Sequence, residues 1–196
     1  MTFKIILAVI LGTLVGFFVP DAWYGATDTL LTIGLCLLLF FVGIDIGKNK
    51  NVFQDIKRTG VLFFLVPIGV AIGSLAGAIA IGALLGYPLH EAGAIGSGMG
   101  WYTLSSIIIA PYSSELSVLA FLTNVVREIL AIALIPIIAK RIGFVEAISP
   151  AGATAMDTTL PIISTNTNSE TAILSFSTGL ILSILVPILV PLFIPL

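Results

Sequence analysis

Charged residues are scarce in this chain of 196 residues. Only 9% are charged, whereas 58% are hydrophobic, and the mean hydropathy is +1.19. Soluble globular domains do not have this composition, so the sequence indicates an integral membrane protein. The formal net charge is -2, and no basic block or stripe could follow a phosphate backbone. We therefore expect no nucleic-acid partner.

Cysteine and histidine are also nearly absent, since Cys36 and His90 are the only residues of their types. A disulfide framework and a cysteine or histidine metal site are excluded, and no metal or other cofactor is expected. The stretch GSGMG at 96–100 lacks the G-x-S-x-G spacing of a nucleophile elbow, and His90 lies in a predicted loop. The sequence therefore does not indicate an enzyme.

Long hydrophobic runs are abundant, and they predict an all-α membrane protein with about five transmembrane helices in a single domain spanning residues 1–196. Each run is close to the ~20 residues that a helix needs to cross a bilayer core. The predicted spans are 3–19, 29–47, 61–86, 116–139 and 172–195.

Two further stretches, 92–110 and 150–168, are too polar and too interrupted to be ordinary spans. The first contains four glycines within eight residues, and the second contains Asp157, Pro161 and a row of threonines. Non-helical backbone at membrane depth is tolerated only where protein or a water-filled cavity satisfies it. A matched pair of interrupted segments is the best sequence indication of a transporter site, and we interpret both stretches as re-entrant hairpins.

The distribution of positive charge predicts the topology. Lysine and arginine collect at 48–58 and 140–141, whereas 21–28 and 87–91 contain none, so the basic loops should be cytoplasmic. Lys140 and Arg141 lie inside only if 92–110 enters from the outer face and returns. The second hairpin then enters from the cytoplasmic side, which leaves the N-terminus cytoplasmic and the C-terminus outside.

Ionisable residues lie in the middle of the fourth predicted span. Glu128 and Asn124 are four residues apart and share a helix face, and Arg127 points about 100° away. Arg127, Glu128 and Asp157 must face protein or water, because an isolated charge at the bilayer centre costs about 2.5 kcal/mol or more. Arg127 could pair with either carboxylate as a buried structural bridge. A binding site in which a cation and protons alternate on the carboxylates is the interpretation that we favour.

The hairpins supply the other candidate groups for binding substrate or protons. Free backbone N–H groups at half-helix starts attract a carboxylate, and hydroxyl groups add contacts. Trp101 and Tyr102 either wall the cavity or fill space at the hairpin tip. These candidates are Ser97, Trp101, Tyr102, Thr103, Ser105, Thr158 and Thr159.

Four motifs in the same order resemble the lysine exporters of the LysO type, a family of prokaryotic membrane proteins. They are GMGWYTLSSIII (98–109), FLTNVVREILAIALIP (121–136), GATAMDTTLPII (152–163) and LILSILVPILVP (180–191). The resemblance implies export of L-lysine and its toxic analogues from the cytoplasm across the cell (inner) membrane, driven by proton entry. It also implies that Glu128 and Asp157 are the important intramembrane acids.

One departure from the family concerns the N-terminus. Full-length members carry an additional N-terminal block of helices, and this chain resembles their C-terminal two-thirds. The resemblance therefore implies a partner, either a short separate membrane chain or a second copy in a homodimer. Two other functions stay open: a passive channel or facilitator for small solutes, and a structural subunit of a heteromeric transporter.

Overall fold

A computed structural model describes residues 60–194 and ten positions nearer the N-terminus. The isolated positions are Leu11, Gly12, Leu14, Val15, Gly16, Phe18, Ile33, Leu37, Phe40 and Ile44. From residue 60 onward the elements are α4 (Leu62–Leu84), α5 (Leu89–Gly96), α6 (Tyr102–Ile109), α7 (Ser114–Arg141), η2 (Glu146–Ile148), η3 (Gly152–Met156), α8 (Leu160–Asn166) and α9 (Ser169–Phe193). The described part of the chain contains no strand, so the all-α prediction is confirmed.

Three of these helices, α4, α7 and α9, are long and apolar enough to cross a membrane. They match the spans predicted at 61–86, 116–139 and 172–195. The spans predicted at 3–19 and 29–47 lie outside the continuously described range.

The starts of the two longest helices follow from local capping chemistry. The Ser113 side chain accepts a hydrogen bond from the Leu116 amide at the start of α7, and Asn168 does the same for Thr171 in α9. Acidic residues lie in both first turns, and Lys140 and Arg141 lie in the last turn of α7. These charges stabilise the helix dipoles, because anions are favourable at N-termini and cations at C-termini.

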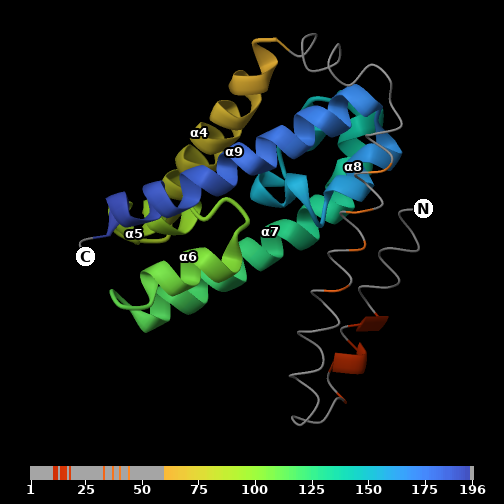
Figure 1. Cartoon of the computed structure of the whole chain (residues 1–196). Coiled ribbons are helices and arrows are strands. Elements are labelled where there is room, and N and C mark those ends of the chain that lie inside the picture. The colour runs from red at the N-terminus through yellow and green to blue at the C-terminus, as the bar shows by residue number, and fades with distance from the viewer. Residues whose placement is uncertain are drawn as a thin grey trace.

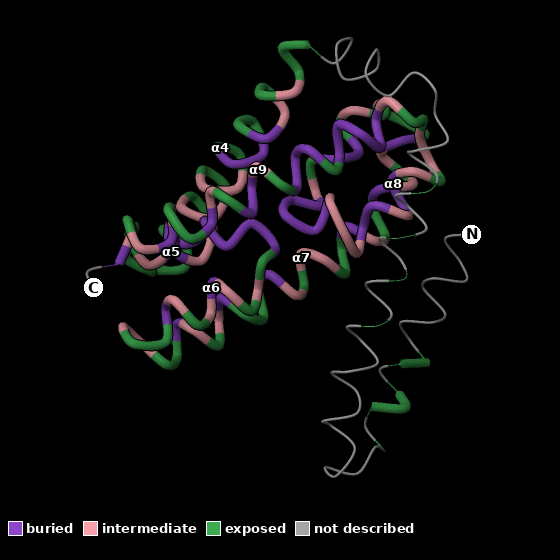
Figure 2. Tube along the Cα trace, viewed as in Figure 1, coloured by how far each residue is buried: buried purple, intermediate pink, exposed green. Residues whose placement is uncertain are grey.

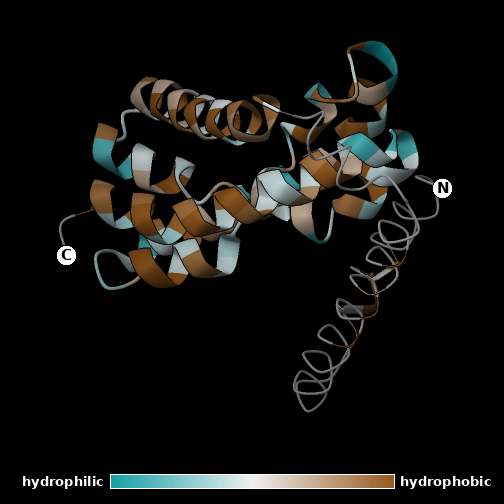
Figure 3. Ribbon diagram, turned by 45° about the horizontal axis from the view of Figure 1, so that its top comes forward, coloured by the Kyte–Doolittle hydropathy of each residue, from teal (hydrophilic) through white to brown (hydrophobic). Residues whose placement is uncertain are grey.

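Helix α9 forms the centre of the bundle (Figure 1), where it contacts α4, α5, α6, α8 and η3. Figure 2 shows buried residues along α9 and in the segments packed against it, whereas α4 and α7 are exposed over much of their length. Hydrophobic residues predominate along the helices, and hydrophilic ones gather towards helix ends (Figure 3). Such a surface suits a bundle surrounded by lipid.

The segment predicted as the first hairpin folds as two short helices, α5 and α6, with a turn between them. Each has eight residues and is about 12 Å long, less than half of a ~30 Å bilayer core. Met99 (φ 47°) and Gly100 (φ 100°) reverse the chain between them. At the end of this segment away from the tip, the Tyr112 hydroxyl donates a hydrogen bond to Glu91 at 3.3 Å. This bond connects the start of α5 to the turn before α7. Burial and the nearby Glu91 carboxylate raise the pKa of Tyr112.

The segment 150–168, which the sequence predicts as the second hairpin, is also broken in the middle. The 3-10 helix η3 ends at Met156, and α8 begins at Leu160 with a proline in its first turn, a position where the missing N–H has no cost. Helix α8 lies at the opposite end of the bundle from α5 (Figure 1).

The tips of the two hairpins meet inside the bundle. The Ala153 amide donates a hydrogen bond to the Met99 carbonyl oxygen at 2.8 Å. Gly152 adopts φ 66°, and a side chain there would collide with the Met99 oxygen. The close approach therefore requires glycine at this position.

Candidate functional site

A cavity of ≈ 120 Å³ lies where the two hairpin tips meet α7 and α9. Its walls come from the start of α6, the middle of α7, the segment from η3 to α8, and one residue of α9. The lining residues are Gly100, Trp101, Tyr102, Thr103, Glu128, Ala153, Thr154, Met156, Asp157, Thr158 and Ser183. Four segments distant in sequence thus build one polar cavity.

Thr158 connects the two carboxylates of the cavity. Its hydroxyl lies 2.5 Å from Glu128 Oε1 and 3.4 Å from Asp157 Oδ1, and its backbone amide donates to Asp157 Oδ1 at 2.6 Å. A threonine hydroxyl carries a single hydrogen, so it serves one carboxylate at a time. The shorter distance assigns that hydrogen to Glu128.

Neither carboxylate forms an ion pair within residues 60–194, and both side chains are half-buried. Two like charges that share a small cavity are unfavourable unless a proton or a cation joins them. The arrangement therefore offers oxygen acceptors suited to a proton, an ammonium group or another small cation.

The structure brings six of the eleven predicted site residues together in this cavity. Glu128 comes from the middle of α7, and Asp157 directly follows η3. The six residues are Trp101, Tyr102, Thr103, Glu128, Asp157 and Thr158. Trp101 and Tyr102 form part of the wall at the hairpin tip.

Four of the other predicted residues do not line the cavity and are buried. The Asn124 side chain accepts a hydrogen bond from the Gly100 amide at 2.7 Å and donates to the Ala120 carbonyl at 2.9 Å. Ser97, Ser105 and Thr159 are buried and bond to nearby carbonyl oxygens within their own hairpins. These side chains satisfy backbone groups at the hairpin tips.

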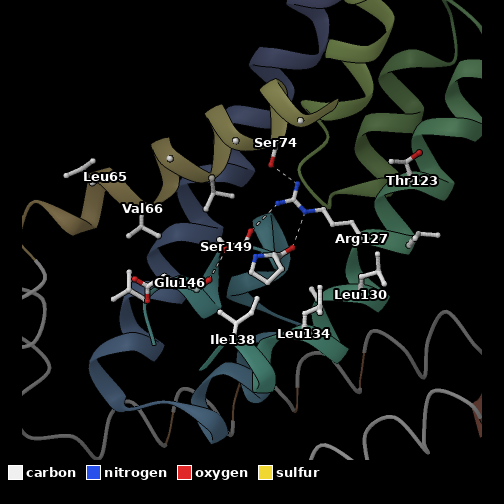
Figure 4. Close-up of a pocket in the computed structure, with 18 residues that line it drawn as sticks. Leu65, Val66, Ser74, Thr123, Arg127, Leu130, Leu134, Ile138, Glu146 and Ser149 are labelled. Atoms are coloured by element: carbon white, nitrogen blue, oxygen red, sulfur yellow. Dashed lines mark hydrogen bonds between the residues drawn. The ribbon is translucent and has the colours of Figure 1, made fainter. Parts of the chain in front are cut away.

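Arg127, the remaining predicted residue, lies on the other side of the second hairpin, in a larger groove of ≈ 790 Å³ between α4 and α7. Its guanidinium donates to Ser74 Oγ at 2.8 Å, to the Pro150 carbonyl at 3.1 Å and to the Ser149 carbonyl at 3.4 Å (Figure 4). Within the described ranges it pairs with neither Glu128 nor Asp157. The structure thus does not bring Arg127 and the two acids together.

Sequence reasoning missed five residues of the cavity wall: Gly100, Ala153, Thr154, Met156 and Ser183. Four of them lie within the predicted hairpins and could have been included as neighbours of candidates. Ser183 belongs to an apolar helix, and its hydroxyl lies 3.7 Å from the Met156 sulfur. A serine in the middle of an apolar span indicates a position that faces protein or a cavity, and Ser183 could have been predicted on this ground.

The amino-acid sequence is similar to one known protein family and to two curated proteins. The family described as "Lysine exporter LysO" matches residues 6–194. A protein of Escherichia coli K12 named "Lysine exporter LysO" is 35% identical over 156 residues, which are 78% of this chain and 51% of that protein. A "Putative lysine exporter" of Haemophilus influenzae Rd is 30% identical over 187 residues, 94% of this chain and 93% of that protein.

The chain thus spans about half the length of the Escherichia coli relative and nearly all of the Haemophilus influenzae relative. No solved structure matches the chain.

Proposed function

The chain belongs to the lysine exporter LysO family, and we propose that it is a secondary active transporter that exports L-lysine and lysine analogues from the cytoplasm in exchange for protons. The family is one of transporters rather than enzymes. The observation that carries the proposal is the pair Glu128 and Asp157, two half-buried acids that share Thr158 in one cavity.

Exchange follows from the chemistry of these acids. A cationic ammonium group and protons compete for the same oxygens, because each neutralises the carboxylates in a desolvated site. When Glu128 takes a proton, the Thr158 hydroxyl loses a charged acceptor. Entry of protons down their gradient would then drive lysine across the membrane in the opposite direction.

The amino-acid end of the substrate is complementary to the first hairpin. Helix α6 begins at Tyr102 without a side-chain cap, and its first residues line the cavity. The unpaired N–H groups of a helix start attract a carboxylate. Lysine would therefore place its α-carboxylate near this helix start and a cationic amine near the acids.

We also propose that both hairpins are re-entrant and enter the bilayer from opposite sides. Their short helices and their meeting at the tips support this topology. Lys140 and Arg141 lie in the last turn of α7, so this end of the helix would be cytoplasmic. The protein would be a multi-pass component of a prokaryotic cell (inner) membrane, with its N-terminus inside and its C-terminus outside.

The test uses the purified chain in proteoliposomes, with labelled lysine counterflow and an internal pH dye as readouts. We expect wild type to accumulate labelled lysine and to couple the flux to proton movement. Glu128→Gln and Asp157→Asn should each reduce this flux at least about 100-fold, because each removes a charge that compensates the substrate. Arg141→Gln, at the exposed end of α7, is the matched control and should transport like wild type.

Other outcomes discriminate among the remaining functions. Lysine flux without proton movement would indicate a passive channel or facilitator. Loss of thermal stability in Glu128→Gln, with no lysine binding by wild type, would indicate a structural subunit. Lysine binding without flux would point to a missing partner, either a short membrane chain or a second copy. The first two outcomes overturn the proposal.

A further inference from the structure

Two adjacent residues of α7 hold the two limbs of the second hairpin. Arg127 donates to the carbonyl oxygens of Ser149 and Pro150, where the chain enters the hairpin. Glu128 accepts from the Thr158 hydroxyl beyond the tip, where the chain leaves η3. Successive helix residues point about 100° apart, so one turn of α7 can contact both limbs.

Arg127 also connects the hairpin to a third element. Its Nη1 donates to Ser74 Oγ on α4, on the far side of the groove (Figure 4). The guanidinium lies so close to Gly152 that a side chain there would come within 3.0 Å of Nη2. Arg127 on α7 thus links residues 149–150, at the entrance of the hairpin, to Ser74 on α4. These contacts do not involve residues that line the cavity.

The acceptors of Arg127 are all neutral oxygens in the described part of the chain. A charged guanidinium in mid-span is stable only where protein groups replace its water, and three oxygens at fixed positions accept its hydrogen bonds. These contacts depend on the hairpin entrance staying where it is. Displacement of residues 149–150 would leave the cation poorly solvated.

On the basis of the proposed function, we infer that Arg127 is a positioning residue. It keeps the second hairpin on α7 during the part of the cycle in which Glu128 is protonated and its hydrogen bond from Thr158 is weaker. In that state the contact between Glu128 and Thr158 is weak, and Arg127 maintains the tip contact between Ala153 and Met99. Arg127 acts on the hairpin and does not touch substrate.

The experiment combines hydrogen–deuterium exchange with transport kinetics on the full chain in lipid. The variants are Arg127→Gln, Arg127→Lys and Ser74→Ala, with Arg141→Gln as the control for loss of an arginine from the same helix. Arg127→Gln should speed amide exchange in 149–158 about tenfold and leave α9 unchanged. The maximal lysine flux should fall about tenfold, while the lysine Kd changes less than about threefold.

The two milder variants keep the inference testable if Arg127→Gln does not fold. Arg127→Lys keeps the charge but loses the planar fork of donors, so its flux should be intermediate. Ser74→Ala removes one acceptor and should raise exchange in 149–158 by a smaller factor in the same segment. Arg141→Gln should match wild type in both measurements.

Three results would overturn the inference. Unchanged exchange in 149–158 would show that Arg127 does not hold the hairpin. Faster exchange throughout α4, α7 and α9 would indicate a general structural role. A lysine Kd that rises in step with the loss of flux would place Arg127 in contact with substrate. If wild type neither binds nor transports lysine, the proposed function fails, and the exchange data still decide whether Arg127 holds the hairpin.

Discussion

The Ala153 amide donates a hydrogen bond to the carbonyl oxygen of Met99, and this 2.8 Å contact joins the tips of two hairpins that lie more than fifty residues apart in sequence. Both partners are main-chain groups. The contact therefore depends on the path of the backbone, which Gly100 and Gly152 shape through their positive φ angles. The cavity with the two acids lies directly beside this contact.

Removal of the donor at the tip should separate the hairpins. Ala153→Pro eliminates the N–H and leaves the buried Met99 carbonyl without its partner, a loss of about 1–3 kcal/mol in folding free energy. Ala153→Gly keeps the N–H and should cost at most about 1 kcal/mol. Thermal unfolding in detergent measures the difference, and equal midpoints for the two variants would contradict the importance of this bond.

A side chain at Gly152 should be strongly unfavourable. Gly152→Ala combines a left-handed backbone, worth about 1–2 kcal/mol, with a collision against the Met99 oxygen and the Arg127 guanidinium. The control is Gly73→Ala on α4, where an added Cβ meets no atom within 4 Å and helix propensity gains about 0.5–1 kcal/mol. Chemical or thermal unfolding should therefore show opposite signs for the two changes. A neutral Gly152→Ala would disprove the close approach.

The hydroxyl of Thr158 should orient Glu128 for exchange. Thr158→Val removes the donor to Oε1, and a hydrogen bond to a charged group contributes about 1.5–3 kcal/mol, so lysine flux should fall at least about tenfold. Thr158→Ser keeps the hydroxyl and should retain most of the flux. Initial rates of labelled lysine efflux provide the comparison. Equal rates for the valine and serine variants would exclude a role for this hydroxyl.

Asn124 should matter more for the first hairpin than the buried serine near its tip. Asn124→Leu leaves the Gly100 amide without an acceptor, which should destabilise the protein by about 1–3 kcal/mol. Ser97→Ala removes a hydroxyl that bonds within its own helix turn, to Ala94, and should cost under about 1 kcal/mol. Unfolding midpoints measured side by side would test this order, and the reverse order would refute it.

Hydrophobic length was sufficient to predict α4, α7 and α9, because about twenty apolar residues without interruption have few other stable forms in lipid. Glycines, prolines and threonines were sufficient to predict that 92–110 and 150–168 are broken. The central position of α9 was not predictable from hydrophobicity, since all three long helices are similarly apolar. Its first half carries Ser175, Ser177 and Gly179, small residues that allow close packing.

The site was partly predictable for a related reason. The cost of a charge in mid-span drew attention to Arg127, Glu128 and Asp157, and this argument does not depend on their neighbours. The direction in which each side chain points depends on the packing of other elements. The opposite placements of Arg127 and Glu128 therefore required the structure, as did the contribution of Ser183 from α9.

The modest volume of the acidic cavity has a consequence for the speed of the protein. The cavity of ≈ 120 Å³ is small, with room for a few water molecules in this structure. Under the proposed function, the segments that line the cavity would move apart when a lysine molecule binds. The rate of transport would then depend on how readily these segments separate. Hydrostatic pressure opposes an increase in volume and should therefore slow transport.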